Sequence, residues 1–129
     1  MERAACLRLR VSRTYANAAG ESCFNTYEIQ RGLRNFAPPA APLFASEIAE
    51  ASGYTVLRLP VGWIGERHLS PKRQILLCLS GRVRITPDVG NPQIIAAGDA
   101  WMMEDTEGSG HKTEVISEEP FDAVVIQIS

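Results

Sequence analysis

The chain has 129 residues, 45% of them hydrophobic and 22% charged, and its formal net charge is −2. This length and composition are typical of one soluble domain with a single core. The slightly acidic balance gives no indication of the strongly basic face that nucleic-acid binding usually requires. No apolar stretch approaches the roughly 20 residues of a transmembrane helix. The sequence therefore predicts a protein that binds neither nucleic acid nor a membrane.

Three cysteines, Cys6, Cys23 and Cys78, are present in the chain. Their odd number and unpaired spacing do not resemble the disulfide framework of a secreted protein. No signal peptide is visible either. We therefore expect a cytoplasmic protein in which Cys78, inside an apolar run, acts as a small hydrophobic side chain.

Residues 1–42 are interpreted as an N-terminal arm that ends in a proline-rich connection. Residues 1–13 carry four arginines and are expected to form a solvated tail or an edge strand. The arm continues to residue 34 and contains a predicted strand at 23–29. Prolines at positions 38, 39 and 42 favour an extended path over a helix. Residues 43–129 are then the main domain.

The main domain reads as many short strands separated by turns. Residues 46–51 fit either one helical turn or an irregular strand. Residues 74–79 form a nearly continuous apolar run, typical of a strand buried on both faces. Residues 82–86 alternate, which predicts that Val83 and Ile85 face inward while Arg82 and Arg84 face solvent. Further strands are expected near residues 56–61, 94–95, 100–103, 112–116 and 123–128. This pattern favours an all-β sandwich or barrel.

A set of spaced residues resembles the first motif of the cupin superfamily, G-x5-H-x-H-x3,4-E-x6-G. Gly62 opens the motif and His68 matches its first histidine. Ser70 stands at the second histidine, Gln74 at the glutamate, and Gly81 closes the motif at the expected spacing.

A later segment resembles the second cupin motif, G-x5-P-x-G-x2-H-x3-N. Gly98 opens it, and His111 resembles its histidine after a loop that is two residues longer than usual. Val115 stands in place of the asparagine. The segments 62–74 and 98–111 also resemble small bacterial cupin-domain proteins of unassigned activity. The resemblance implies a cupin fold, a double-stranded β-helix or jelly-roll barrel with an N-terminal arm, and a homodimer is expected.

The resemblance implies a metal site formed by His68, Gln74 and His111 inside the barrel. Imidazole nitrogens suit Fe, Ni or Zn, whereas oxygen ligands suit harder ions such as Mn. Gln74 offers only a neutral carbonyl oxygen, so the charge of a divalent cation stays uncompensated unless Glu66, Glu104 or Asp105 turns inward. The alternatives are a metal-free pocket in which the imidazoles bind polar groups of a ligand or move protons, and purely structural histidines.

Four other residues are candidates for the pocket: Trp63, Ser70, Trp101 and Asp105. Each also has a structural interpretation, since tryptophans often pack in a core or a dimer contact and the segment around Asp105 resembles a tight turn. Arg73, adjacent to Gln74, is expected to point away from the pocket and to pair with an acidic residue.

The expected function is therefore the handling of a small molecule. The chain would be a divalent-metal-dependent enzyme, similar to cupin dioxygenases or isomerases, or a non-catalytic binding or sensing cupin with a degenerate metal site. A third hypothesis is an interaction partner that supports another enzyme. The catalytic residues and the ligand are not predicted.

Overall fold

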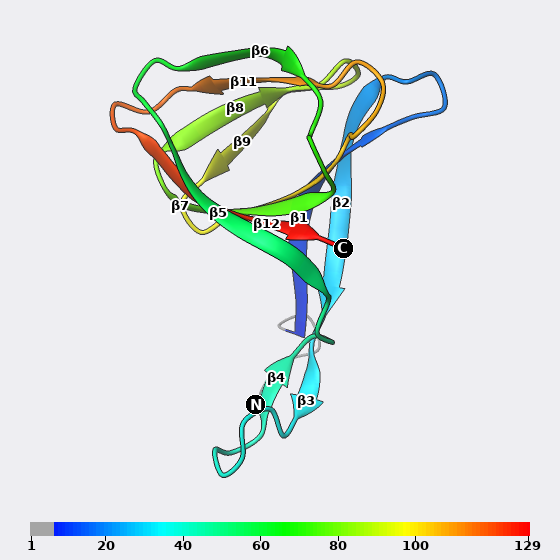
Figure 1. The fold of residues 1–129 in the computed structure, drawn as a ribbon, viewed down its shortest axis with the longest axis vertical. Coiled ribbons are helices and arrows are strands. Elements are labelled where there is room, and N and C mark those ends of the chain that lie inside the picture. The colour runs from blue at the N-terminus through cyan, green and yellow to red at the C-terminus, as the bar shows by residue number, and fades with distance from the viewer. Residues whose placement is uncertain (1–6) are drawn as a thin grey trace.

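The computed structural model describes residues 7–129, and within this range every regular element is a strand (Figure 1). The all-β prediction is confirmed. The first part of the expected basic tail, including Cys6, lies outside the described residues. From residue 7 to the end of the chain, no helix is long and apolar enough to cross a membrane.

The larger of two main sheets contains six strands in the order β2-β1-β10-β7-β12-β5. All neighbours in it are antiparallel except β1 and β10, which run parallel. Its strands are β1 (Arg8–Ala16), β2 (Ser22–Gln30), β5 (Ala51–Leu59), β7 (Gln74–Ser80), β10 (Ala100–Glu104) and β12 (Phe121–Ile128).

The smaller sheet has four antiparallel strands in the order β6-β11-β8-β9 and faces the larger one. Its strands are β6 (Ile64–His68), β8 (Arg82–Thr86), β9 (Gln93–Ala96) and β11 (His111–Val115). Among the described residues, strand pairing does not join the two sheets into one closed barrel. The arrangement is a jelly roll, as predicted.

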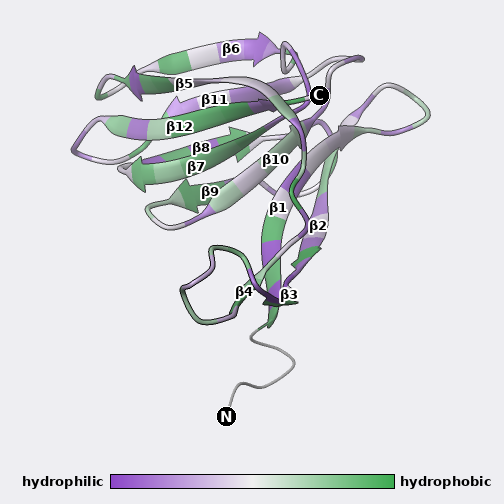
Figure 2. Ribbon diagram, turned by 60° about the horizontal axis from the view of Figure 1, so that its bottom comes forward, coloured by the Kyte–Doolittle hydropathy of each residue, from purple (hydrophilic) through white to green (hydrophobic). Residues whose placement is uncertain are grey.

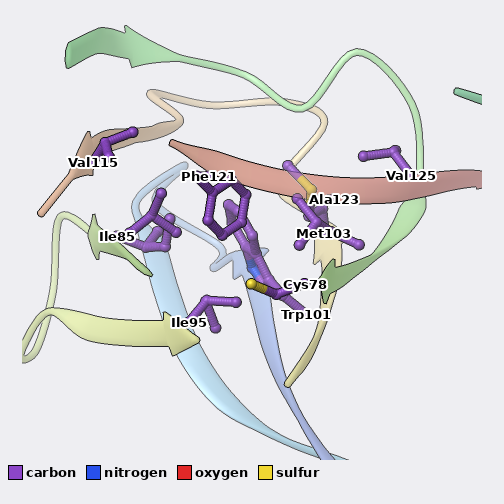
Figure 3. Close-up of a cluster of buried hydrophobic side chains, with 11 residues drawn as sticks. Cys78, Ile85, Ile95, Trp101, Met103, Val115, Phe121, Ala123 and Val125 are labelled. Carbon is purple, nitrogen blue, oxygen red and sulfur yellow. The ribbon is translucent and has the colours of Figure 1, made fainter. Parts of the chain in front are cut away.

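The core lies between the two sheets, where inward-facing side chains of both meet. Figure 3 shows Phe121 of β12 among buried side chains from the smaller sheet, such as Ile85 and Ile95, and from the larger sheet, such as Met103 and Val125. All of these side chains are at most 6% exposed. The alternation of apolar and polar residues along short strands therefore builds one core, in agreement with the sequence pattern.

Strand β8 confirms the predicted alternation, because Val83 and Ile85 are completely buried while Arg82 is exposed and Arg84 is half-buried. The prediction for residues 74–79 was wrong in one respect. On β7 only the inward side chains are buried, whereas Leu77 is 37% and Leu79 is 58% exposed. No second layer within the described residues covers that face of the larger sheet, so an apolar run does not by itself establish burial on both faces.

The arm joins the larger sheet of its own chain through β1 and β2, and the strand expected at 23–29 is confirmed within β2. Thr14 and Ser22 are buried, so the arm shares the core of the domain. Residues 46–51 form no helix and remain irregular until β5 begins. Between β2 and that segment, β3 (Gly32–Arg34) and β4 (Leu43–Ala45) pair with each other as a separate hairpin. This hairpin stands away from both main sheets (Figures 1 and 2).

Candidate functional site

A cavity of about 240 Å³ lies between the two sheets, and its wall is mostly aliphatic and aromatic. The apolar lining residues are Leu57, Leu59, Trp63, Pro71, Leu76, Val83, Trp101, Met103, Phe121 and Val125. Four polar residues complete the wall: His68, Gln74, His111 and Thr113. No carboxylate, ammonium or guanidinium group belongs to this lining. The cavity therefore suits a ligand without a formal charge.

His68 and His111 face each other across a pair of neighbouring strands. They are register partners on β6 and β11, and their ring centroids lie 4.8 Å apart. The sequence predicted that both rings converge from adjacent strands, and the geometry confirms this. Gly110 permits the close approach, because it has a φ of 77° and a Cβ there would overlap the carbonyl oxygen of His68.

His111 is completely buried and its Nδ1 is hydrogen-bonded to the carboxylate of Asp105, which is also completely buried. The same carboxylate accepts hydrogen bonds from Ser70 Oγ at 2.8 Å and Thr14 Oγ1 at 3.0 Å. Burial of Asp105 by itself raises its pKa. The hydrogen bonds from His111, Ser70 and Thr14 outweigh this effect and hold the pKa of Asp105 below its ordinary value. Asp105 is therefore an ionised partner that fixes the orientation of the His111 ring.

Thr14 extends this network to Trp101. Its hydroxyl accepts a hydrogen bond from Trp101 Nε1 at 3.1 Å while it donates to Asp105. The indole of Trp101 in turn contacts His111 edge-on, with ring centroids 5.1 Å apart. Thr14 of β1 and Trp101 of β10 therefore help to hold the ring of His111 in place.

His111 Nε2 is the one buried side-chain nitrogen or oxygen in residues 7–129 that has no hydrogen-bond partner. Since Nδ1 is bound to Asp105, Nε2 is the nitrogen of this cavity-lining ring that is left without a partner. His68 is arranged in a similar way, because its Nδ1 lies 2.6 Å from the carbonyl oxygen of Glu66. A carbonyl can only accept, so Nδ1 carries the hydrogen and Nε2 of the neutral His68 ring carries a lone pair.

The predicted pocket residues separate into two groups. Trp63 and Trp101 line the cavity, as do His68, Gln74 and His111. Ser70 and Asp105 are not part of the lining and lie behind His111, where they orient it. The amide of Gln74 donates to the sulfur of Met103 at 3.4 Å and accepts a long contact of 3.5 Å from Gln127.

The other acidic residues named from the sequence lie away from the cavity lining. Glu66 is exposed, and Glu104 pairs with Arg13 and Arg73. The expectation that Arg73 pairs with an acidic residue is thereby confirmed.

Two residues of the site were not predicted from the sequence. Thr113 lines the cavity two positions after His111, so strand alternation along β11 was a usable signal for it. Thr14 had no such signal, since it lies 91 positions before Asp105 and only the parallel pairing of β1 with β10 brings it to the site.

The donor set around the cavity does not make a complete site for a divalent cation. It offers two imidazole nitrogens and one neutral amide oxygen, and no group of three or more His, Cys, Asp or Glu side chains among the described residues could hold an ion. No carboxylate in the lining offsets a double positive charge in this apolar surrounding. The metal-ligand roles expected for His68, Gln74 and His111 therefore stay predictions.

Comparisons with known proteins find only distant similarities. No protein-family model and no curated protein matches the chain. A cupin 2 conserved barrel domain protein from Salinispora arenicola is similar in structure, with 14% identity, a TM-score of 0.49, and coverage of 76% of this chain and 73% of that chain. The cupin domain of Cnp3 from Schizosaccharomyces pombe has 9% identity, a TM-score of 0.46 and coverage of 95% and 85%. A conserved protein of unknown function from Streptococcus pyogenes has 26% identity, a TM-score of 0.43 and coverage of 65% and 70%. These similarities carry no information about the ligand.

Fold and site together define a small jelly-roll domain with a histidine-lined cavity between its sheets. The jelly-roll arrangement agrees with the fold that the two sequence motifs predicted.

Proposed function

We propose that the cavity binds a small, uncharged, ring-sized molecule with one polar group, which forms a hydrogen bond with His111 Nε2. The observation that carries the proposal is the buried Nε2 atom without a hydrogen-bond partner at the wall of the cavity. Leaving such a group unsatisfied costs about 1–3 kcal/mol, and a ligand that bonds to it recovers this free energy.

The chemical class of the ligand follows from the wall. A cavity of about 150 Å³ takes up benzene, so the 240 Å³ here have room for a ring with a small substituent. Trp63, Trp101 and Phe121 offer aromatic surface to such a ring. Because Nδ1 of His111 donates its hydrogen to Asp105, Nε2 of the neutral ring is an acceptor. The preferred ligand therefore carries an O–H or N–H donor.

The rival hypothesis is a metal-dependent enzyme. The two engaged Nδ1 atoms favour it, since metal-binding histidines usually donate the other ring N–H to an oxygen. The uncharged lining opposes it, because no carboxylate there compensates a divalent cation. We therefore propose binding, with no assigned reaction, as the function that the geometry supports best.

Phenol and toluene test the proposal, because they have nearly the same shape and differ in one hydroxyl group. Titration calorimetry and tryptophan fluorescence measure both affinities. A purely apolar cavity prefers toluene, since burying an unpaired hydroxyl is unfavourable. We expect phenol to bind about tenfold more tightly than toluene, corresponding to about 1.4 kcal/mol.

The variant His111→Asn is the matched control. Its amide nitrogen takes the place of Nδ1 and still donates to Asp105, while the acceptor at Nε2 is removed. This variant is expected to prefer toluene. Equal or weaker binding of phenol than toluene to the native chain, or an unchanged phenol preference in the variant, would refute the proposal. Tight binding of Zn²⁺, Ni²⁺, Mn²⁺ or Fe²⁺ that both His111→Asn and His68→Asn abolish would favour the metal hypothesis instead.

A further inference from the structure

The β3–β4 hairpin carries an apolar surface that nothing in residues 7–129 covers. Its members, called the hairpin surface below, are Leu33, Phe36, Leu43, Phe44 and Ile48, with exposures between 39% and 85%. Residues 35–46 contain no charged side chain. The hairpin pairs only with itself and stands away from the two main sheets (Figures 1 and 2). Loops that remain exposed to water are usually polar. An exposed apolar surface on such a loop is therefore a candidate interaction site.

A second apolar surface lies on the larger sheet, on the side turned away from the core. It is formed by Tyr54 and Val56 of β5 and by Leu77 and Leu79 of β7, and is called the outer sheet face below. These side chains are 76%, 64%, 37% and 58% exposed. Tyr54 and Leu77 flank β12 on either side, because β12 pairs with both β5 and β7. The surface is therefore continuous across three strands of the sheet.

Neither surface covers the other within one chain, since both remain exposed. A groove of about 740 Å³ lies where the hairpin leaves the domain. Its lining is formed by residues 27–32, 34, 46–47 and 49–51, together with Arg73, Ile75, Met102, Ile126 and Ile128. The hairpin thus projects away from its own sheet, and the groove lies at its base.

We propose that the outer sheet face receives the hairpin surface of a second copy of this chain, and that each copy does this for the other. A two-fold axis relates the two copies, so the dimer contains two equivalent hairpin–sheet contacts. Together these contacts cover the hairpin surface and the outer sheet face of both copies. The cores of protein interfaces are depleted of charge and enriched in aromatic residues, as both surfaces are here. This inference does not depend on the ligand of the cavity.

The amount of surface is sufficient for a stable dimer. With 150–250 Å² for a whole aromatic side chain and roughly 100 Å² for an aliphatic one, the two surfaces present on the order of 700 Å² in each copy. A standard specific interface buries roughly 800 Å² per partner. The exposed ion pair Arg58–Asp122 lies beside the outer sheet face and would belong to the polar rim of this interface.

The test uses one charged substitution on each surface, both at exposed positions. Leu33→Asp alters the hairpin surface and Val56→Asp alters the outer sheet face. Ile94→Asp on β9, which is 45% exposed on the smaller sheet, is the matched control. Sedimentation velocity at micromolar concentration gives the oligomeric state, and circular dichroism verifies that each variant is folded. We expect the native chain and the Ile94→Asp variant to be dimers. Each of the other two variants alone should have a dimer dissociation constant raised at least tenfold.

Mixing the two variants gives the decisive result. In a mixed dimer, one hairpin–sheet contact carries both substitutions and the other carries none, so dimers should reappear on mixing. A native chain that is monomeric would overturn the proposal, and so would Leu33→Asp and Val56→Asp variants that dimerise as well as the native chain. A mixture that stays monomeric would also overturn it, because a reciprocal hairpin–sheet contact leaves one contact of the mixed dimer without any substitution.

Discussion

Replacing Thr14 by valine isolates the support that the arm gives to the site. Valine keeps the shape of threonine and its strand preference, but it removes the hydroxyl. That hydroxyl donates to the buried carboxylate of Asp105 and accepts from Trp101 Nε1. Asp105 keeps its other two donors, Ser70 and His111, so the domain is expected to fold.

Two contributions set the magnitude of the effect. A hydrogen bond to a charged group contributes about 1.5–3 kcal/mol, and a buried donor left without an acceptor costs about 1–3 kcal/mol. The extra methyl group offsets part of this loss. We therefore expect the free energy of unfolding to fall by about 3 kcal/mol. With a urea dependence of about 2 kcal/mol/M, the urea midpoint drops by about 1.5 M.

Urea unfolding followed by tryptophan fluorescence measures this change, at one fixed protein concentration. Thr26→Val is the control, because Thr26 is an exposed threonine on β2, next to β1. Its substitution should change stability by no more than about 0.5 kcal/mol. If both variants had the same midpoint, the network around Asp105 would contribute nothing to stability and the reasoning would be refuted.

Three further substitutions test the geometry of the site. Gly110→Ala should lower stability by at least about 2 kcal/mol and abolish phenol binding, because the new Cβ pushes His68 away. Gly90→Ala, with a similar φ and open space, should show only the backbone strain, and equal effects would contradict this. The loss of stability in Asp105→Asn should be largest above about pH 4 and should shrink as the pH falls through the lowered pKa of the native carboxyl. A loss that urea titrations show to be independent of pH would contradict this. Gly65→Ala should displace the ring of Trp63, shift its fluorescence to longer wavelengths and weaken phenol and toluene equally, whereas unchanged spectra would place that ring elsewhere.

The sequence predicted those features that depend on local pattern or on motif spacing. The alternation of residues 82–86 placed Val83 and Ile85 in the core, and the spacing of two motifs brought His68 and His111 together. These predictions succeed because strand periodicity and fixed turns determine on which face a side chain lies.

Other features depend on partners that are distant in the sequence. Nothing local to Thr14 indicates a carboxylate 91 positions away, and the contact arises only when β1 pairs with β10. The exposed side of β7 is a second case. An apolar run has the same composition whether a layer of its own chain or another molecule covers it, so Leu77 and Leu79 were misassigned.

The parallel pairing of β1 with β10 also sets the order in which the domain can assemble. Closing a loop of 91 residues costs about 4 kcal/mol in chain entropy, and this cost precedes any gain from the contacts it brings. Non-local pairing of this kind places a domain among the slower folders. Until β1 returns, β10 has an unpaired edge and Asp105 lacks one of its donors. The N-terminal strand, synthesised first, is therefore expected to dock late, and the pocket becomes competent to bind only at the end of folding.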